Sequence, residues 1–493
     1  MKVSDYISYL NTRLGQNPFW LKEDMEISAA TMDSRRVVRG AVFCAVKGAK
    51  ADGHDFIRAV VDAGAALVVC ERELPTELAK AVSWIRVPNG YHAMALVAEM
   101  AADFPAAKMR FYGITGTNGK TTSAYLLRNI LRKDPARKVG MVGTIVYDTG
   151  GREIAADRTT PSPFELQGLL AEMRRNGVTD VVMEVSSHAI DQRRTGSIMF
   201  DACLFTNLTQ DHLDYHHTME EYYLCKRRLF IEMARPNAVE VVNLDDAWGR
   251  RLAGDCMANG RGGRVTFGEA EDAAVQCFPE GNGRLSMHFK AEGGELALCT
   301  PMPGDYNVRN VAGVAALAVS MGIPKDDITQ AVAAFTGAPG RLQPVELPNG
   351  AMAYVDYAHT DDAISKAISA LRPICKGRLV IVFGCGGDRD RTKRPKMAVA
   401  AAKADRVIVT SDNPRTEDTA AIIADILPGF PPSCKPVVVP GRREAIHTAV
   451  AGLASDDMLL VAGKGHEDYQ EINGVKHHFS DAEVIAEAAA LCR

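Results

Sequence analysis

The chain has 493 residues, more than one hydrophobic core usually serves, so about three domains are expected. Hydrophobic residues make up 47% and charged residues 24%, an ordinary balance for a soluble globular protein, and the formal net charge of -4 offers no general basic field for nucleic acid or an anionic membrane. The 11 cysteines form no CxxC pair, which argues against a disulfide framework or a structural zinc site.

The N-terminal sequence MKVSDYISYL has no basic segment followed by an apolar one, so no secretory signal is expected. No apolar run approaches the roughly 18 residues of a membrane span. Together with the cysteine pattern, these features predict a cytoplasmic protein with no membrane or nucleic-acid partner.

Strand-like apolar runs alternate with helical patterns from the start of the chain. In residues 1–108 a run at 42–46 (VFCAV) and a helical pattern at 56–65 predict a small α/β domain. Residues 109–336 carry further strand-like runs separated by helical stretches, which predicts a mostly parallel, doubly wound sheet. The glycine-rich part 254–300 predicts irregular or antiparallel structure.

The segment 336–345 (TGAPGRLQPV) is rich in glycine and proline and marks a second domain boundary. Residues 337–493 repeat the α/β alternation, and most of their strand-like runs end in Gly, Asp, Asn or His. Ligands in open α/β sheets bind beyond the carboxyl ends of the strands, so these strand ends are the places where a site is expected.

The strongest local signal is the segment 115–122 (TGTNGKTT) after a strand-like run at 110–112. Small residues let backbone N–H groups face phosphates, and the following helix adds its positive end. Lys120 would neutralise phosphate charge, and the Thr121 hydroxyl can join a magnesium shell. The match to GxxxxGK[ST] is imperfect because position 114 is Ile, and a glycine-rich turn without nucleotide is the alternative. The predicted nucleotide contacts are Gly116, Thr117, Asn118, Gly119, Lys120, Thr121 and Thr122.

Three features downstream of this turn carry weaker signals. Glu184 ends the strand-like run at 180–184 and is placed to hold magnesium, although alone such a residue is more often an edge or capping residue. The stretch 206–217 contains three His and two Asp, but no cysteine or HExxH helix supports zinc, so a hydrogen-bonded polar loop is the default interpretation. Spacing alone suggests that Lys226 is a solvated helix lysine.

Charged and polar residues follow three strand-like runs of the last block, at 384–391 (GCGGDRDR), 412–415 (DNPR) and 463–467 (GKGHE). Arginine forks suit carboxylates, and Asp, Asn or Glu suit an ammonium group, so these segments predict a pocket for a zwitterionic amino acid. The basic run through Lys396 could instead be a solvated face or a nucleic-acid patch. Its interspersed acids and lack of aromatic residues argue against nucleic acid.

Eight segments together resemble the Mur ligase family along nearly the whole chain. They are GTNGKTT, TTPS, MEVSSH, NLTQDHLDYH, VDYAH, FGCGGDRD, DNPR and GKGHEDYQ. Within the family, the chain is most similar to the ligases that add meso-2,6-diaminopimelate.

The resemblance implies an α/β protein of three domains: a UDP-substrate-binding domain at 1–108, a central P-loop ATPase domain with a mostly parallel sheet at 109–336, and a Rossmann-like amino-acid-binding domain at 337–493. It implies ATP and Mg²⁺ as cofactors and UDP-N-acetylmuramoyl-L-alanyl-D-glutamate and meso-2,6-diaminopimelate as substrates. ATP would phosphorylate the D-glutamyl carboxylate, and the incoming amine would attack the acyl-phosphate. The implied setting is peptidoglycan synthesis by a monomer, with links to cell shape and division.

The resemblance also assigns roles to residues. Catalysis is implied for Lys120, Glu184, His212 and Lys226. Metal binding is implied for Thr121, Glu184, His212 and Lys226, the last as N6-carboxylysine, a carbamate. The UDP substrate would be bound by Met32, Ser34, Ala49, Lys50, Ala51, Arg158, Thr159, Thr160, Ser186, Gln192 and Arg194. Further ATP contacts would come from Asn307, Asn310, Arg341, Asp356 and His359. Diaminopimelate would be bound by Arg389, Asp412, Asn413, Pro414, Arg415, Gly463 and Glu467.

Meso-diaminopimelate differs from lysine by a second carboxylate, so a selective pocket needs a cation at that position, and Arg415 is the candidate. The alternative for this residue is that it only braces its loop through Asp412 or Glu417. Two alternatives for the whole chain are a lysine-adding ligase and a nucleotide-binding regulator without ligase activity. Folylpolyglutamate synthetases share the P-loop architecture but are not expected to carry DNPR together with GGDRD.

Overall fold

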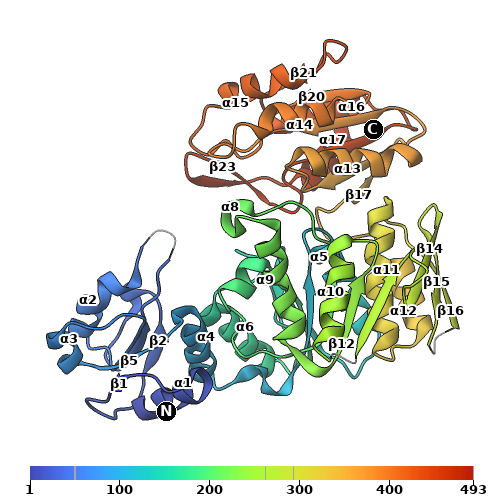
Figure 1. Ribbon diagram of the computed structural model, residues 1–493. Helices are drawn as coiled ribbons and strands as arrows, with labels where there is room; N and C mark the ends of the chain where they lie inside the picture. The colour runs from blue at the N-terminus through green and yellow to red at the C-terminus, as the bar shows by residue number, and fades with distance from the viewer. Residues whose placement is uncertain (49–50, 261–262, 292–293, 492–493) are drawn as a thin grey trace. The chain divides into compact units, whose positions relative to one another are not determined.

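The computed structural model describes residues 1–48, 51–260, 263–291 and 294–491, and these fold into two compact units (Figure 1). The first unit consists of residues 1–267 and 316–321, and the second consists of residues 268–315 and 322–493.

A small sheet at the start of the first unit has helices on both faces. Its strand order is β1-β5-β4-β3-β2, and all neighbours are parallel except β1 and β5. The strands are β1 (Phe19–Trp20), β2 (Ala29–Thr31), β3 (Ala41–Cys44), β4 (Leu67–Cys70) and β5 (Ser83–Arg86). The helices are α1 (Val3–Leu14), η1 (Ser34–Arg36), η2 (Gly53–Phe56), α2 (Ile57–Asp62), α3 (Thr76–Ala81), α4 (Gly90–Ala101) and η3 (Pro105–Lys108). Val42 of β3 packs with α1 and α4, whereas Phe43 packs with α2 and α3, because successive strand residues face opposite sides.

The larger sheet of the first unit has the order β13-β12-β11-β6-β10-β7-β8-β9. The strands are β6 (Arg110–Thr115), β7 (Val139–Val142), β8 (Val146–Asp148), β9 (Glu153–Ala155), β10 (Asp180–Glu184), β11 (Phe200–Phe205), β12 (Ala234–Asn243) and β13 (Arg264–Gly268). All pairs are parallel except the two that involve β8. The helices are α5 (Lys120–Leu131), α6 (Pro163–Arg175), α7 (Ser187–Asp191), α8 (Leu213–His216), α9 (Met219–Ile231) and α10 (Ala247–Ala258). Figure 1 shows α5, α6, α9 and α10 around this sheet.

Strand register brings three chemically important segments to one edge of this sheet. The central strand β6 pairs with β10 on one side, where Glu184 is opposite Ile114, and with β11 on the other, where Phe205 is opposite Thr115. Because all three strands are parallel, the turn after β6, the end of β10 and the segment after β11 lie together at their carboxyl ends. The predicted mostly parallel sheet is confirmed.

The second unit begins with an antiparallel meander, as expected for part of the glycine-rich segment. Its strands are β14 (Val275–Gly281), β15 (Arg284–Phe289) and β16 (Gly294–Cys299). The helices that follow are α11 (Asp305–Ser320), of which residues 316–320 belong to the first unit, and α12 (Lys325–Ala334).

The sheet that follows has the order β17-β18-β22-β19-β20-β21, parallel except for β17. Its strands are β17 (Gln343–Glu346), β18 (Met352–Asp356), β19 (Leu379–Phe383), β20 (Arg406–Val409), β21 (Val437–Val438) and β22 (Met458–Ala462), and β23 (Tyr469–Ile472) pairs with β24 (Val475–His478) in a separate hairpin. The helices are α13 (Asp361–Leu371), η4 (Arg372–Ile374), α14 (Lys393–Ala401), α15 (Thr419–Ile426), η5 (Leu427–Gly429), α16 (Arg442–Ala451) and α17 (Asp481–Leu491).

Both faces of this second-unit sheet are buried. Ile381 of β19 lies in a core with α13, α14 and α15, whereas its neighbour Val382 lies in a core with α16 and α17. Burial on both faces explains why the strands are continuous apolar runs rather than alternating patterns. The Rossmann-like α/β architecture predicted for this part is therefore confirmed, while the domain boundaries at 108/109 and 336/337 stay a prediction.

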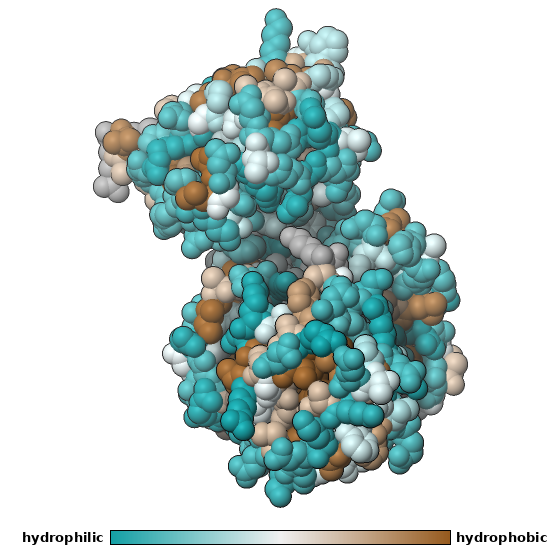
Figure 2. Space-filling view, turned by 90° about the vertical axis from the view of Figure 1, so that its left-hand side faces the viewer, coloured by the Kyte–Doolittle hydropathy of each residue, from teal (hydrophilic) through white to brown (hydrophobic). Residues whose placement is uncertain are grey.

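On the face that Figure 2 shows, hydrophilic residues cover most of the surface and hydrophobic residues form separate patches. In the described ranges, no helix is both long enough and apolar enough to cross a membrane.

Candidate functional site

The turn between β6 and α5 has the strand–turn–helix arrangement that the sequence predicts. The helix begins at Lys120, and its N-cap is Gly119 in the left-handed region with φ 86° and no side-chain cap. The first backbone N–H groups of a helix have no partners within the helix, so this end can bind an anion such as a phosphate. The Lys120 Nζ lies over the turn and donates to the carbonyl oxygens of Gly116 at 2.8 Å and Thr117 at 2.9 Å.

The segment after β11 closes one side of this turn. Asn207 accepts the backbone N–H of Asn118 at 3.0 Å with its Oδ1, and its carbonyl oxygen accepts the N–H of Thr117 at 2.9 Å. Thr206 donates from Oγ1 to the Asn118 carbonyl oxygen at 2.6 Å. Gly116 has φ 153°, and a Cβ atom there would overlap Thr206 Oγ1 and lie 3.0 Å from the Asn207 oxygen.

We therefore expect Gly116→Ala to push the 206–207 segment away from the turn and to weaken nucleotide binding at least about tenfold, because the turn loses the hydrogen bonds that hold its shape. Isothermal titration with ADP measures this. Gly168→Ala in α6 is the control: a Cβ at this position meets nothing within 4 Å, so native affinity is expected. Native affinity in Gly116→Ala would contradict the prediction.

Glu184, at the end of β10, is fully buried and satisfied by hydrogen bonds, so it is not the edge or capping residue that its sequence position alone suggests. Its carboxylate accepts the Thr121 hydroxyl at 2.8 Å, the Thr144 backbone N–H at 2.8 Å and the Thr144 hydroxyl at 2.9 Å. The carboxylate and the Thr121 hydroxyl are oxygen ligands of the kind that Mg²⁺ prefers.

Lys226 is buried in α9 with 1% of its surface exposed, so its interpretation as a solvated helix lysine is wrong. Its Nζ donates to the Gly116 carbonyl oxygen at 3.0 Å and contacts Thr115 Oγ1 at 3.4 Å, below the nucleotide turn. Burial, followed by the charge of Lys120, lowers the pKa of Lys226 well below its usual value. Among the residues that the structure describes, no carboxylate forms an ion pair with it.

Three histidines of the predicted polar loop and its neighbour α7 form an aromatic cluster beside Lys226. The His188 ring lies 4.9 Å from the His212 ring and 5.7 Å from the His216 ring, and His216 stacks on Tyr222 at 5.1 Å. Burial lowers the pKa of all three imidazoles, and burial together with His212 lowers that of His188 to about 4. These rings are therefore neutral near pH 7 and can accept a proton or bind a metal.

No group of three His, Cys, Asp or Glu side chains suited to a metal ion occurs in residues 1–48, 51–260, 263–291 and 294–491. Mg²⁺ is usually held by one or two carboxylates together with substrate phosphates, so Glu184 and Thr121 fit a magnesium site that a nucleotide completes.

Five of the residues predicted to bind the UDP substrate form one hydrogen-bond network next to Glu184. Thr160 donates from its hydroxyl to the Glu184 carbonyl oxygen at 2.8 Å, and its own carbonyl accepts Arg194 Nη1 at 2.8 Å. Arg194 also donates from Nη2 to Gln192 Oε1 at 2.8 Å. Thr159 and Ser186 join through hydroxyl contacts with Thr144 at 3.0 Å and Thr160 at 3.4 Å.

The other predicted residues for this substrate are dispersed. Arg158 is exposed, and its backbone rather than its side chain is bound, by the Tyr147 hydroxyl. Met32 and Ser34 lie in the small N-terminal sheet region, at the start of η1. Ala49 and Lys50 lie outside the described residues, and Ala51 directly follows them.

In the second unit, four polar residues meet beyond the carboxyl ends of β20 and β22. Asn413 donates from Nδ2 to Glu467 Oε2 at 2.8 Å. Lys464 is fully buried and donates from Nζ to Asn413 Oδ1 at 3.0 Å and to Glu467 Oε2 at 3.3 Å. Gly463 has φ 116°, and a Cβ there would overlap the Asp412 carboxylate. Lys464 already uses Asn413 Oδ1 and Glu467 Oε2, so a substrate ammonium group would be bound by the Asp412 carboxylate and the other Glu467 oxygen.

Arg415 points into the same region from the segment after β20. Its Nη1 donates to the Gly387 carbonyl oxygen at 2.7 Å, and its Nε lies 3.4 Å from Glu471 Oε2. The alternative bracing through Asp412 or Glu417 is therefore wrong, because Glu417 pairs with Arg394 instead. Within the described part of the chain, Arg415 Nη2 makes no hydrogen bond, so it can bind a carboxylate. Pro414 precedes Arg415 and its carbonyl accepts the Glu417 N–H at 3.0 Å, whereas Arg389 is exposed.

The further residues predicted to contact ATP form two groups in the second unit. Asn307 and Asn310 are buried neighbours on α11, and Asn310 Nδ2 lies 3.4 Å from Asn307 Oδ1. Asp356, at the end of β18, accepts the Leu342 N–H at 2.7 Å and the Ala358 N–H at 2.8 Å, and burial raises its pKa. Arg341 lies over the Tyr357 ring, and His359 bonds the Tyr357 carbonyl oxygen.

Sequence reasoning missed Thr144, Asn207, Lys464 and Glu471. Asn207 and Lys464 lie in quoted motifs and Thr144 follows the end of β7 by two residues, so the strand-end rule could have found all three. Glu471 lies in the β23–β24 hairpin and has no sequence signal of its own. Lys226 had a signal that was not used: it lies four residues after Tyr222 and four before Phe230, on the buried face of α9.

Three family models match the chain. They are described as "Mur ligase family, catalytic domain" over residues 26–104, "Mur ligase middle domain" over residues 114–318, and "Mur ligase, glutamate ligase domain" over residues 340–465.

Curated relatives match over almost the full length. A Gloeobacter violaceus protein named UDP-N-acetylmuramoyl-L-alanyl-D-glutamate--2,6-diaminopimelate ligase is 41% identical over 472 residues, which cover 94% of each chain. A Geobacter metallireducens protein of the same name is 39% identical over 495 residues and also covers 94% of each chain.

Solved structures agree with these matches. A structure of a ligase with that name superposes with a TM-score of 0.67 at 31% identity and covers 94% of this chain and 95% of the other. The MurF ligase of Thermotoga maritima in complex with ADP gives a TM-score of 0.57 at 18% identity, with 94% and 97% covered, which shows a shared fold only.

Proposed function

The chain belongs to the Mur ligase family, and on that premise we propose that it is the ATP-dependent ligase that joins meso-2,6-diaminopimelate to UDP-N-acetylmuramoyl-L-alanyl-D-glutamate in peptidoglycan precursor synthesis. The observation that carries this function is identity of 39–41% to relatives of that name over 94% of both chains.

ATP would bind at the turn 115–122, which supplies an uncapped helix N-terminus, a glycine cradle that a Cβ would fill, and Lys120. Thr121 and Glu184 would hold Mg²⁺ between them and the nucleotide phosphates, which would neutralise phosphate charge. His212 is a further proposed metal ligand, and its neutral imidazole suits that role. Asn307, Asn310, Arg341, Asp356 and His359 are the proposed remaining ATP contacts.

The reaction would proceed by transfer of the γ-phosphoryl group to the D-glutamyl carboxylate, which gives an acyl-phosphate and ADP. The amine of diaminopimelate would then attack the acyl carbon, phosphate would leave, and the amine would lose a proton as the amide forms. Thr159, Thr160, Ser186, Gln192 and Arg194 would hold the acceptor peptide beside the phosphates. No side-chain nucleophile is needed, because positioning of the reactants and neutralisation of the phosphate charge lower the activation barrier.

Lys226 would act as a carbamate. Its neutral amine would form a bond to the carbon of CO₂ and release a proton, which replaces a buried neutral amine with an anion. Two observations support this: its Nζ is buried without a carboxylate partner among the described residues, and the charge of Lys120 already disfavours its protonated form. An anion at this position would attract Lys120 rather than repel it.

Amino-acid choice would depend on Arg415, whose Nη2 would bind the second carboxylate of diaminopimelate. An ammonium group of the same molecule would lie near Asp412, Asn413, Gly463 and Glu467. With lysine, Glu471 would remain a partner of the guanidinium, but Nη2 would lack the second carboxylate, and a buried charged donor without its acceptor typically costs about 2–5 kcal/mol. We expect Arg415→Ala to lower kcat/KM for diaminopimelate on the order of tens to thousands-fold and to narrow the gap to lysine without necessarily improving lysine use.

The measurement is kcat/KM with each amino acid for the native enzyme and for Arg415→Ala. Lys435→Ala, at an exposed position in the segment before β21, is a control that should keep native values. Equal losses with both amino acids in Arg415→Ala would show that Arg415 only supports its loop.

One assay distinguishes the proposed function from two alternatives, namely ligation of L-lysine and nucleotide binding without ligase activity. Phosphate release is measured with UDP-N-acetylmuramoyl-L-alanyl-D-glutamate and ATP, with each amino acid in turn. The proposal requires release that depends on diaminopimelate, whereas release only with lysine, or with neither, contradicts it. Cytoplasmic location, a monomeric state and a contribution to cell shape and division belong to the same proposal.

A further inference from the structure

A buried arginine, Arg394, joins the loop that carries Arg389 to the segment that carries Arg415. It lies in the first turn of α14 with 1% of its surface exposed. Its Nη2 donates to Glu417 Oε1 at 2.7 Å and its Nη1 donates to Glu417 Oε2 at 3.0 Å, a bidentate pair. The same Nη1 donates to Asp425 Oδ2 in α15 at 2.8 Å.

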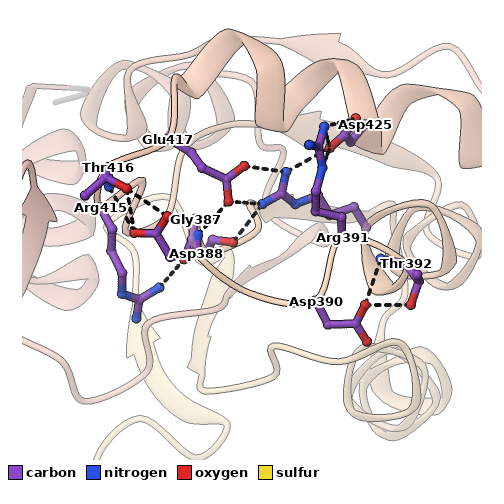
Figure 3. Close-up of polar contacts among 11 residues, drawn as sticks. Gly387, Asp388, Asp390, Arg391, Thr392, Arg415, Thr416, Glu417 and Asp425 are labelled. Carbon is purple, nitrogen blue, oxygen red and sulfur yellow. Dashed lines mark hydrogen bonds and ion pairs between the residues drawn. The ribbon is translucent and has the colours of Figure 1, made fainter. Parts of the chain in front are cut away.

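Glu417 transmits this contact to both loops. It lies two residues after Arg415, and its Oε1 also accepts the backbone N–H of Asp388 at 2.6 Å. The Asp388 carboxylate in turn accepts the Thr416 hydroxyl at 2.8 Å. Figure 3 shows Glu417 and Asp388 between the two loops, with Arg415 and Gly387 alongside. The segments 384–392 and 412–418 are therefore held together by one network.

The position of the Arg415 guanidinium depends on that network. The Arg415 Nη1 donates to the carbonyl oxygen of Gly387. Both neighbours of Gly387 are held by the network: the Gly386 carbonyl oxygen accepts Arg394 Nη2 at 3.4 Å, and the Asp388 N–H donates to Glu417. Asp388 has φ 53° and Arg415 has φ 52°, a left-handed conformation that residues other than glycine rarely adopt. Such residues keep this conformation where surrounding contacts fix it, and these hydrogen bonds are the contacts.

The chemistry of the pair favours positioning over simple stabilisation. The Glu417 and Asp425 side chains are 24% and 29% exposed, so solvent screens their attraction to Arg394 and the pairs contribute little net stability. In the part of the chain that the structure describes, the Nε of Arg394 is buried without a hydrogen-bond partner, which is a further loss. Arg391 binds Asp425 through Nε at 2.9 Å and Nη2 at 3.1 Å, so the carboxylate that flanks Arg394 is itself held in place (Figure 3).

We propose that Arg394 is a positioning residue for amino-acid recognition. Through Glu417 it fixes the placement of the Arg389 loop against Arg415, and so it sets the preference for an amino acid with a second carboxylate. The inference rests on the proposed function, because it assigns the pocket to diaminopimelate. Arg394 would act without touching the substrate. The basic run around it suggested a solvated face, and for Arg394 that interpretation is wrong because the side chain is buried.

The test compares Arg394→Lys and Glu417→Gln with the native enzyme. Lysine keeps the charge but lacks the planar fork, so the loops lose their bidentate link without a buried charge being removed. We expect KM for diaminopimelate to rise about tenfold or more, with kcat and KM for the UDP substrate changed less than about threefold, and the preference over lysine to fall by a similar factor. Because both variants break the same link, their effects on KM are expected to be far from additive in the double variant.

Asp457→Asn is the matched control. Asp457 is buried, and its Oδ2 accepts both Arg378 Nε at 3.2 Å and Arg378 Nη2 at 2.7 Å, at the amino ends of β19 and β22 in the same unit. This variant should lower the unfolding midpoint and leave KM for diaminopimelate native.

The outcomes separate the two levels of the proposal. If Arg394→Lys and Glu417→Gln lower the unfolding midpoint as Asp457→Asn does while KM for diaminopimelate and amino-acid preference stay native, Arg394 is only structural and the inference is overturned. If the native enzyme does not ligate diaminopimelate at all, the proposed function itself fails. A raised KM for diaminopimelate with a native KM for the UDP substrate supports the inference.

Discussion

Lys120→Ala is expected to lower kcat for ligation by roughly 10³-fold, because the cation that neutralises phosphate charge in the transition state is removed. The side chain lies over the nucleotide turn, where its Nζ bonds the carbonyl oxygens of Gly116 and Thr117. These bonds are local, so the fold should remain intact. Steady-state phosphate release with saturating ATP measures the loss, and thermal unfolding checks the fold.

Lys133→Ala provides the control for this prediction. Lys133 is exposed just past the other end of α5, so its removal changes the charge of the chain equally and leaves the turn untouched. Native kcat is expected for it. Turnover close to native in Lys120→Ala would contradict the assignment of this turn as the phosphate site.

Lys226→Ala is expected to lower kcat by roughly 10²–10³-fold, because the proposed carbamate anion is lost from beneath the nucleotide turn. Truncation also leaves a space beside Gly116 and Tyr222, which Lys226 contacts in the native protein. Formate or acetate can enter that space and supply an anion, so partial recovery of kcat with rising carboxylate concentration is expected.

Lys226→Arg separates the carbamate from simple charge. Arginine stays protonated and cannot form a carbamate, so this variant should be as inactive as Lys226→Ala and should show no recovery with formate. Mass spectrometry of the native protein after incubation with ¹³C-bicarbonate and chemical trapping provides a second readout. An active enzyme in which Lys226 carries no trapped carboxyl group would contradict the carbamate.

Much of the fold could be predicted from the sequence, and so could part of the nucleotide site at 115–122 and of the polar pocket beyond β20 and β22. Glycine spacing in 115–122 and the strand-end rule led to Lys120, Glu184, Asp412 and Gly463, because strand ends and turns have local signatures. The parallel strand order and the strand register then bring those ends together. The sequence pattern predicts the fold class, but not this register.

What could not be predicted depends on contacts between distant segments. The basic run 389–396 looks solvated, yet Arg394 within it is buried against Glu417 and Asp425, since α14 packs on α15. The alternative role for Arg415 was to brace its loop through Asp412 or Glu417, whereas its partners in the structure are Gly387 and Glu471. Arg415 also has a left-handed backbone conformation, which no residue pattern in the sequence predicts.

The most direct test of the central claim is a one-pot competition. The native enzyme is incubated with ATP, Mg²⁺, UDP-N-acetylmuramoyl-L-alanyl-D-glutamate and equal concentrations of meso-diaminopimelate and L-lysine, and the products are identified by mass spectrometry. The proposed function predicts ADP, phosphate and a UDP-linked tripeptide that contains diaminopimelate, in excess over the lysine product by about tens-fold or more, the order expected when Arg415 Nη2 lacks its carboxylate acceptor. Equal amounts of the two tripeptides, a predominant lysine product, or ATP hydrolysis without any tripeptide would contradict it.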